Sequence, residues 1–226
     1  MQRLVIAGAM VLVATACTSN SSQSPVQQDA VILPLQVTSG TPAGDANISK
    51  SGGPLSHESV HLSGDEEPFT PTTPGGPTPA DSHGQGQAII RFAADNLSFD
   101  YTLIASNIEN ITQAHIHCGS PGVTGPIMIW LYPSVTSTAT APNGAGRHDG
   151  VLAEGTVKSG VALNVRTVAT TNSACPGGVA NFAQALAKIR AGQAYVNVHT
   201  NDGVGAINTG PGDFPGGEIR GQLFTH

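Results

Sequence analysis

The chain has 226 residues, of which only 11% are charged, and its formal net charge at pH 7 is −6. The scarcity of charged residues, together with 28 glycines and 16 prolines, disfavours long surface helices and favours short strands joined by many turns. The negative charge argues against a nucleic-acid partner, and no run of about 20 apolar residues is present to span a bilayer.

Residues 1–16 have the pattern of a secretion signal. Arg3 supplies a positive start, residues 4–13 form a short apolar core, and small residues lead up to Cys17. A cysteine directly after such a segment resembles the lipobox of bacterial lipoproteins, in which it becomes the diacylated first residue of the mature chain. The alternative is an ordinary secretory signal with an incidental cysteine. The lipoprotein interpretation predicts a lipid anchor on Cys17 that faces the cell surface or the periplasm.

Residues 17–56 are rich in Ser, Gln, Pro and Gly, which predicts a flexible tether between the lipid and a domain at 57–226. The apolar run at residues 30–37 could dock as a strand, although Pro34 disfavours a central position. Residues 68–80 contain five prolines and cannot form a regular helix or an inner strand.

The remaining segments alternate in the manner of strands. Leu97, Phe99, Tyr101 and Leu103 share one face, and residues 127–132 (IMIWLY) are apolar on both faces, as in a central strand. Further strands are expected at 151–157, 195–200 and 218–224. One short helix is expected from Asn181 to Gly192. Seven or so strands with one helix predict an all-β sandwich.

Two cysteines, Cys118 and Cys175, remain once Cys17 is assigned to lipidation. In an exported domain, two cysteines most simply form a disulfide. Two free thiols are the alternative.

Several motifs, in a fixed order, resemble one known family, the chordin-type (CHRD) domain, over residues 59–224. They are HLSG at 61–64 with Glu67-Pro68, AHIH at 114–117, YVNVHT at 195–200 and PGGEIRGQL at 215–223. The resemblance implies an immunoglobulin-like or superoxide-dismutase-like β-sandwich. It implies little about activity. A Pro-rich insert after Glu67 and a cysteine directly after the HIH motif depart from the family pattern.

The polar residues of these motifs alternate with apolar ones along the predicted strands. His115 and His117 therefore share a face, and His199 faces the same way as Asn197 on a later strand. If these strands are neighbours, the three histidines could hold Cu(II) or Zn(II). The alternative is a structural polar network made of Asn197, Glu218 and Arg220 around the histidines.

Signals for catalysis are absent from the sequence. We find no GxSxG elbow, no second carboxylate opposite Glu218 and no phosphate-binding loop. Two function classes remain. The first is a non-catalytic surface module that binds a protein or glycan, and the second is a metal-binding or metal-dependent redox protein that uses His115, His117 and His199.

Overall fold

A computed structural model gives the structure of the protein and describes residues 57–71, 73–135 and 139–224. The expected signal peptide, the lipidation site Cys17, the tether at 17–56 and the apolar run at 30–37 lie outside the described residues. Among the described helices, none has the length and apolar character needed to cross a membrane.

The described residues form eight strands, one α-helix and two short 3-10 helices. The strands are β1 (His57–Ser63), β2 (Gln85–Phe92), β3 (Ser98–Glu109), β4 (Ile111–Cys118), β5 (Ile127–Tyr132), β6 (Arg147–Lys158), β7 (Ala194–Thr200) and β8 (Ile219–Gln222). The helices are α1 (Phe182–Arg190), η1 (Gly64–Glu66) and η2 (Pro79–Asp81). The expected all-β class with one short helix is confirmed.

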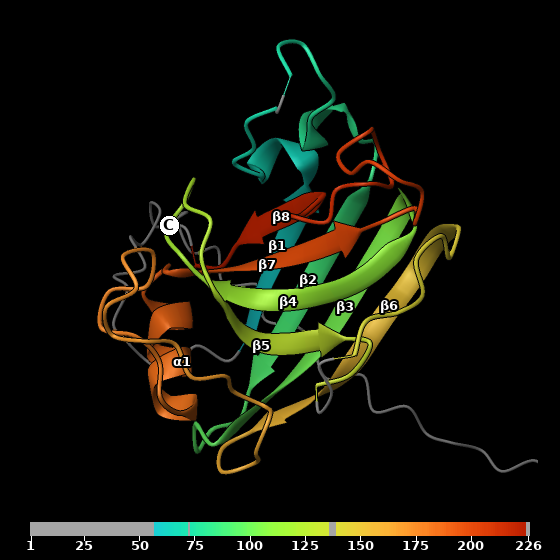
Figure 1. Cartoon of the computed structure of the whole chain (residues 1–226). Coiled ribbons are helices and arrows are strands. Elements are labelled where there is room, and N and C mark those ends of the chain that lie inside the picture. The colour runs from blue at the N-terminus through green and yellow to red at the C-terminus, as the bar shows by residue number, and fades with distance from the viewer. Residues whose placement is uncertain (1–56, 72, 136–138, 225–226) are drawn as a thin grey trace, which may run out of the picture. The chain divides into compact units, whose positions relative to one another are not determined.

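All strand pairs are antiparallel, in the order β5-β4-β7-β8-β1-β2-β3-β6. Figure 1 shows that β5, β4, β7 and β8 form a front layer that crosses a back layer of β1, β2, β3 and β6. The layers are joined where β8 meets β1, through the pair Ser63 and Arg220. Gly221 permits this junction, because a Cβ there would lie 2.3 Å from the carbonyl oxygen of His61. The result is one continuous sheet folded into two facing halves.

The hydrophobic core lies between the two layers. Ile116, Val196 and Val198 of the front layer face it, as their alternation predicted, and so do Phe99 and Leu103 of the back layer. Leu97 was expected to share the face of Phe99, Tyr101 and Leu103, but it precedes β3 and is 58% exposed. Its backbone N–H donates to the Asp95 side chain, which places it in the turn before the strand.

Strand β5 has the expected bounds but not the expected place. It pairs only with β4 and is therefore an edge strand rather than a central one. Both of its faces are nevertheless largely buried. A segment from the β6–α1 connection covers its free edge, since the Arg166 N–H donates to the Met128 carbonyl at 2.7 Å. An apolar pattern on both faces reports burial and not position in the sheet.

Helix α1 begins and ends as the sequence predicted. The Asn181 side chain caps the first turn by accepting a hydrogen bond from the Gln184 N–H at 3.0 Å, and Gly192 follows the last turn at φ +67°. The buried residues Phe182, Leu186 and Ile189 face the core. The ring of Phe182 stacks on Phe99 with centroids 5.9 Å apart. The helix thereby contributes its apolar face to the core of the domain.

Cys118 and Cys175 lie at disulfide distance, with their sulfur atoms 1.94 Å apart and both residues fully buried. Cys118 is the last residue of β4, and its side chain points to the core, opposite to His117. The bond attaches the connection that precedes α1 to the front layer. It also leaves no free thiol at either of these positions for metal binding.

Candidate metal centre

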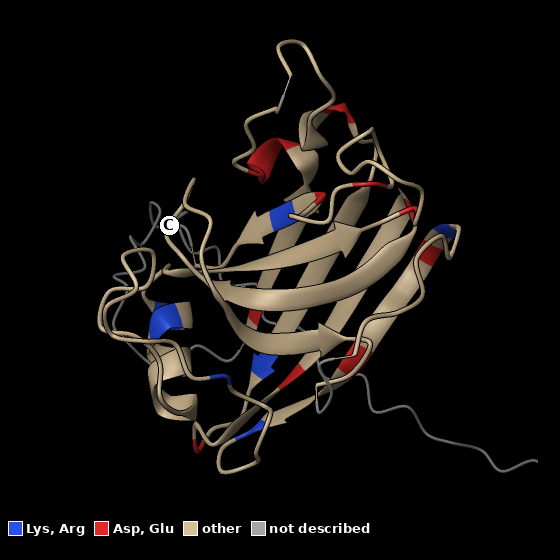
Figure 2. Ribbon diagram, viewed as in Figure 1, with Lys and Arg blue, Asp and Glu red and all other residues tan. Residues whose placement is uncertain are grey.

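The outer face of the front layer is buried although it is polar. The residues on it that are at most 6% exposed are His115, His117, Trp130, Tyr195, Asn197, His199, Arg220 and Gln222. Figure 2 shows that β4, β5 and β7 carry no Lys, Arg, Asp or Glu. The fourth strand of the layer, β8, carries Arg220. A buried polar face of this kind must satisfy its groups by hydrogen bonds or by a bound ion.

Strand pairing brings the three histidines together. In the β4–β7 register, His115 is opposite Asn197, His117 is opposite Tyr195, and Gln113 is opposite His199. The donor nitrogens of the three histidines all lie within 4.8 Å of one another. Nδ1 of His115 is 3.1 Å from Nε2 of His199, and Nε2 of His117 is 3.3 Å from the same atom. His199 is therefore the centre of the cluster.

Two loop carbonyls fix the tautomers of two of these rings. Nδ1 of His117 is 2.8 Å from the Gly125 carbonyl oxygen, and Nδ1 of His199 is 2.9 Å from that of Pro215. A carbonyl oxygen only accepts, so each Nδ1 carries the proton that it donates. In a neutral ring, Nε2 then holds a lone pair. The two Nε2 lone pairs face each other across 3.3 Å with no proton between them.

His115 cannot resolve this conflict by itself. If its Nδ1 is protonated, it can donate to Nε2 of His199, but the lone pair of His117 stays without a donor. If its Nδ1 is bare, three lone pairs converge. In either state the buried Nε2 of His115 has no hydrogen-bond partner. Its ring instead contacts Trp130 edge-on, with centroids 4.1 Å apart.

Burial keeps the three rings neutral. The pKa of His115 falls to about 2, that of His117 to about 3 and that of His199 to about 4, with burial as the largest cause in each case. Repulsion from His199 is the second cause of the low pKa values of His115 and His117. The contacts with the Gly125 and Pro215 carbonyls act in the opposite direction and are weaker than burial.

The spacing of the donor atoms fits a metal ion. Zinc or copper bonds to imidazole nitrogen are about 2.0–2.1 Å long, which places two ligand nitrogens about 3.3 Å apart at a tetrahedral angle. The two separations from Nε2 of His199, 3.1 and 3.3 Å, agree with this value, and the nitrogens of His115 and His117 lie within 4.8 Å of each other. A cation at this point would receive the lone pairs that lack a donor.

The expected structural network of Asn197, Glu218 and Arg220 does not form as one unit. Glu218 points away from the histidines and accepts hydrogen bonds from the hydroxyls of Ser82 and Thr200 and from the Gly212 N–H. These contacts hold three separate segments together. The carboxylate of Glu218 is therefore committed elsewhere and does not act as a fourth ligand beside the histidines.

Arg220 holds the loop that covers the cluster. Its guanidinium donates to the carbonyls of Ser120 and Val123 and lies over the Tyr195 ring at 3.4 Å. Tyr195 in turn stacks on His117, with centroids 4.9 Å apart and an interplanar angle of 12°. The same loop supplies the Gly125 carbonyl that fixes His117. Arg220 thus orders the site through its cover, and does not form an ion pair with Glu218.

Glu67 is a residue of this face that sequence reasoning did not assign to the site. Burial raises the pKa of its carboxyl to about 7, and the positive charge of Arg220 and the amide of Asn197 oppose that rise. Neither side-chain atom of Asn197 makes a hydrogen bond of normal geometry, although its amide is close enough to Glu67 to favour the carboxylate. Glu67 directly follows η1 in the chain, and no periodic pattern in the sequence indicates that it lies near β7 and β8.

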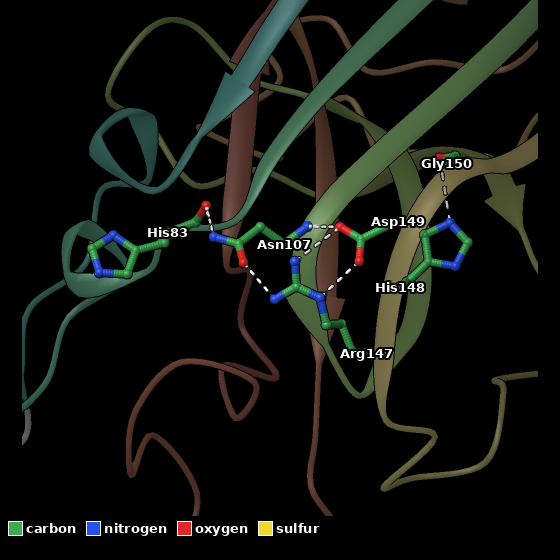
Figure 3. A network of polar contacts seen from close by, with 6 residues as sticks. All are labelled: His83, Asn107, Arg147, His148, Asp149 and Gly150. Atoms are coloured by element: carbon green, nitrogen blue, oxygen red, sulfur yellow. Dashed lines mark hydrogen bonds and ion pairs between the residues drawn. The ribbon is translucent and has the colours of Figure 1, made fainter.

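The other described histidines, His57, His61, His83 and His148, lie outside the cluster at exposed or partly exposed positions. Figure 3 shows the polar network at the start of β6, in which Arg147 contacts Asn107 and Asp149. His83 contributes its backbone carbonyl to Asn107, and the His148 ring approaches the Gly150 carbonyl at 3.3 Å. This network ties β3 and β6 to the connection that precedes β2. His83 and His148 take no part in the three-histidine cluster.

Gly217 packs directly on Asn197. A Cβ at Gly217 would lie 2.4 Å from Nδ2 of Asn197, and its φ of +136° is unfavourable for other residues. We expect Gly217→Val to lower the free energy of unfolding by about 1–3 kcal/mol, the usual magnitude for a strained backbone position. Urea unfolding measures the change. Gly216→Val is the matched control, because a Cβ there meets nothing within 4 Å. Equal stability of the two variants would contradict the expectation.

Comparison with protein-family models identifies the family of the domain. A family model for the CHRD domain matches residues 59–223, from within β1 to just after β8. Searches of curated proteins and of solved structures gave no match. The matched range contains all three histidines, Glu67 and the residues of the covering loops. The chain belongs to the CHRD domain family.

Proposed function

We propose that this protein is a lipid-anchored extracytoplasmic protein whose CHRD domain binds one transition-metal ion, copper or zinc, through His115, His117 and His199. One observation carries the proposal: the Nε2 atoms of His117 and His199 face each other at 3.3 Å while their Nδ1 atoms donate to backbone carbonyls. A bound cation satisfies both lone pairs at once. Each ring is oriented by a hydrogen bond from its other nitrogen, as is usual for metal-binding histidine.

Metal analysis of the full chain, purified without a polyhistidine tag and without chelator, tests the proposal. We expect about one metal ion per chain. After chelation, titration with copper or zinc can be followed by the fluorescence of Trp130, the one tryptophan of the sequence, which contacts His115. A protein that stays metal-free and gives no saturable titration with either ion would refute metal binding.

Substitution of the central ligand should abolish the site. We expect His199→Ala to lower metal affinity by at least about 100-fold, because loss of a residue that only orients a ligand costs about 10–100-fold and this change removes a ligand itself. The exposed His83→Ala is the matched control and should bind as the wild type does. His117→Gln provides a second ligand variant, and circular dichroism verifies folding. Wild-type affinity in folded forms of both ligand variants would contradict the assignment.

A second candidate function is a non-catalytic surface module that displays its loops to a protein or glycan. It is favoured by the buried side chains that hold loop backbone in place. Gln222 donates to the carbonyls of Gly119, Gly192 and Ala194, and Arg220 donates to those of Ser120 and Val123. In this case the full chain would be metal-free as purified, and its melting temperature would not respond to added copper or zinc.

The anchor is proposed from the sequence around Cys17. We expect Cys17→Ser to move the protein from the membrane fraction to the soluble extracytoplasmic fraction, because the residue to be acylated is lost. The melting temperature of the β domain should not change, since Cys17 precedes the family match by about 40 residues. Fractionation followed by immunoblotting measures the distribution. Retention of the Ser variant in the membrane fraction would argue against a lipid anchor.

A further inference from the structure

We propose that the three-histidine cluster is selective for monovalent copper, Cu(I), over Zn(II) and Cu(II). This inference rests on the metal-binding function proposed above and specifies the ion. It follows from the number of ligands, from their charge and from the way in which the site is covered.

The site offers three ligands and no evident fourth. Among the described residues, the group of side chains able to hold a metal consists of His115, His117 and His199, without a carboxylate or a thiolate. The neighbouring carbonyls of Gly125 and Pro215 accept hydrogen bonds from the histidines themselves. Zn(II) held by three histidines takes a water or another small ligand as its fourth ligand, and Cu(II) prefers a tetragonal set of nitrogen and oxygen ligands. Cu(I) is satisfied by three imidazole nitrogens.

The charge of the surroundings also favours a monovalent ion. All three ligands are neutral, so no ligand charge offsets the charge of the metal. They are also at most 6% exposed, so water screens that charge little. The cost of burying an ion rises with the square of its charge, which makes a divalent ion about four times as costly as a monovalent one. Arg220 adds a buried positive charge that acts on His117. The acidic groups that act on Arg220 are Glu67 and Glu66, and neither belongs to the group of side chains able to hold the metal.

The cover of the site restricts the entry of water as an additional ligand. Trp130 packs on His115 with centroids 4.1 Å apart, and Tyr195 stacks on His117 at 4.9 Å. The Gly125 carbonyl of segment 119–126 contacts Nδ1 of His117, and the Pro215 carbonyl of segment 201–217 contacts Nδ1 of His199. A four-coordinate divalent ion would need a water or anion as its fourth ligand, at a site whose three histidines are at most 6% exposed.

Competition titrations of the full chain in one buffer test the selectivity. Cu(I) is added anaerobically in the presence of the chromophoric chelator bicinchoninate, and Zn(II) is added against a chromophoric zinc chelator. We expect Cu(I) to bind at least about 100-fold more tightly than Zn(II). X-ray absorption should show three nitrogen ligands, and the copper protein should remain silent in electron paramagnetic resonance after exposure to air. The His83→Ala variant should reproduce these results, whereas His199→Ala should lose Cu(I) affinity.

The outcomes separate the two proposals. Zn(II) binding as tight as Cu(I) binding, or a tetragonal Cu(II) signal after exposure to air, would overturn the selectivity and leave metal binding intact. Absence of saturable binding of all three ions would overturn both. Cu(I) binding that survives in folded His199→Ala and His117→Gln variants would place the ion elsewhere and overturn the inference.

Discussion

Loss of the disulfide between Cys118 and Cys175 is expected to lower the free energy of unfolding by about 4 kcal/mol. The two residues are 57 positions apart, and a loop of this length confers about 4 kcal/mol through the restricted entropy of the unfolded chain. Both residues are fully buried, so that a substitution must be apolar to avoid a second effect. We therefore compare the wild type with the Cys118→Ala/Cys175→Ala double variant in urea unfolding.

The loss should also affect the cover of the candidate metal centre. Cys118 directly follows His117, and its backbone N–H donates to the Pro126 carbonyl at the base of the covering loop. We expect hydrogen exchange of segment 119–126 to accelerate in the double variant more than that of β2 and β3. An unfolding midpoint within error of the wild type would show that the bond adds nothing to stability.

Stability of the metal-free protein is expected to fall steeply as the pH is lowered from about 6.5 to about 4. The pKa values of His115, His117 and His199 are about 2, 3 and 4 in the folded protein, against 6.5 for an ordinary histidine. The unfolded chain therefore takes up protons first as the pH falls, which favours unfolding. Each histidine contributes up to about 1.4 kcal/mol per pH unit in this range.

Glu67 acts in the opposite direction. Its pKa of about 7 in the folded protein exceeds the ordinary value of 4.5, so the folded state takes up its proton first between these values. This uptake stabilises the fold as the pH falls and offsets the effect of one histidine. Between about pH 6.5 and pH 4.5, the net loss in the free energy of unfolding therefore corresponds to two histidines, since Glu67 offsets the third. Glu67→Gln should remove the offset and steepen the loss over the same range.

Thermal unfolding in the presence of a chelator between pH 8 and pH 4 measures this dependence. His199→Gln should flatten it, because one buried histidine is removed, whereas His83→Ala should leave it unchanged. A melting temperature that does not change across this interval would mean that the three rings are not buried in the neutral form. Bound metal should make the loss of stability steeper, since protons then compete with the ion for the same nitrogens.

The sequence alone determined the fold class and the faces of the main strands. Alternation in β4 and β7 placed His115, His117 and His199 opposite the apolar residues Ile116 and Val198, because successive side chains of a strand point to opposite faces. The helix was defined by Asn181 and Gly192, since caps act within one turn. These properties are local, because each depends on residues within a few positions of one another in the sequence.

Only the tertiary structure decided which strands are neighbours and what covers their outer face. The pairing of β4 with β7 joins residues about 80 positions apart, and that distance leaves no periodic signal in the sequence. Strand β5 carried the apolar pattern of a central strand yet lies at an edge, because other segments bury it. The tautomers of His117 and His199 depend on carbonyls of two loops, and any residue type presents the same carbonyl group. The residue types of the candidate metal ligands could therefore be predicted from the sequence, whereas their convergence depended on long-range strand pairing and on the covering loops.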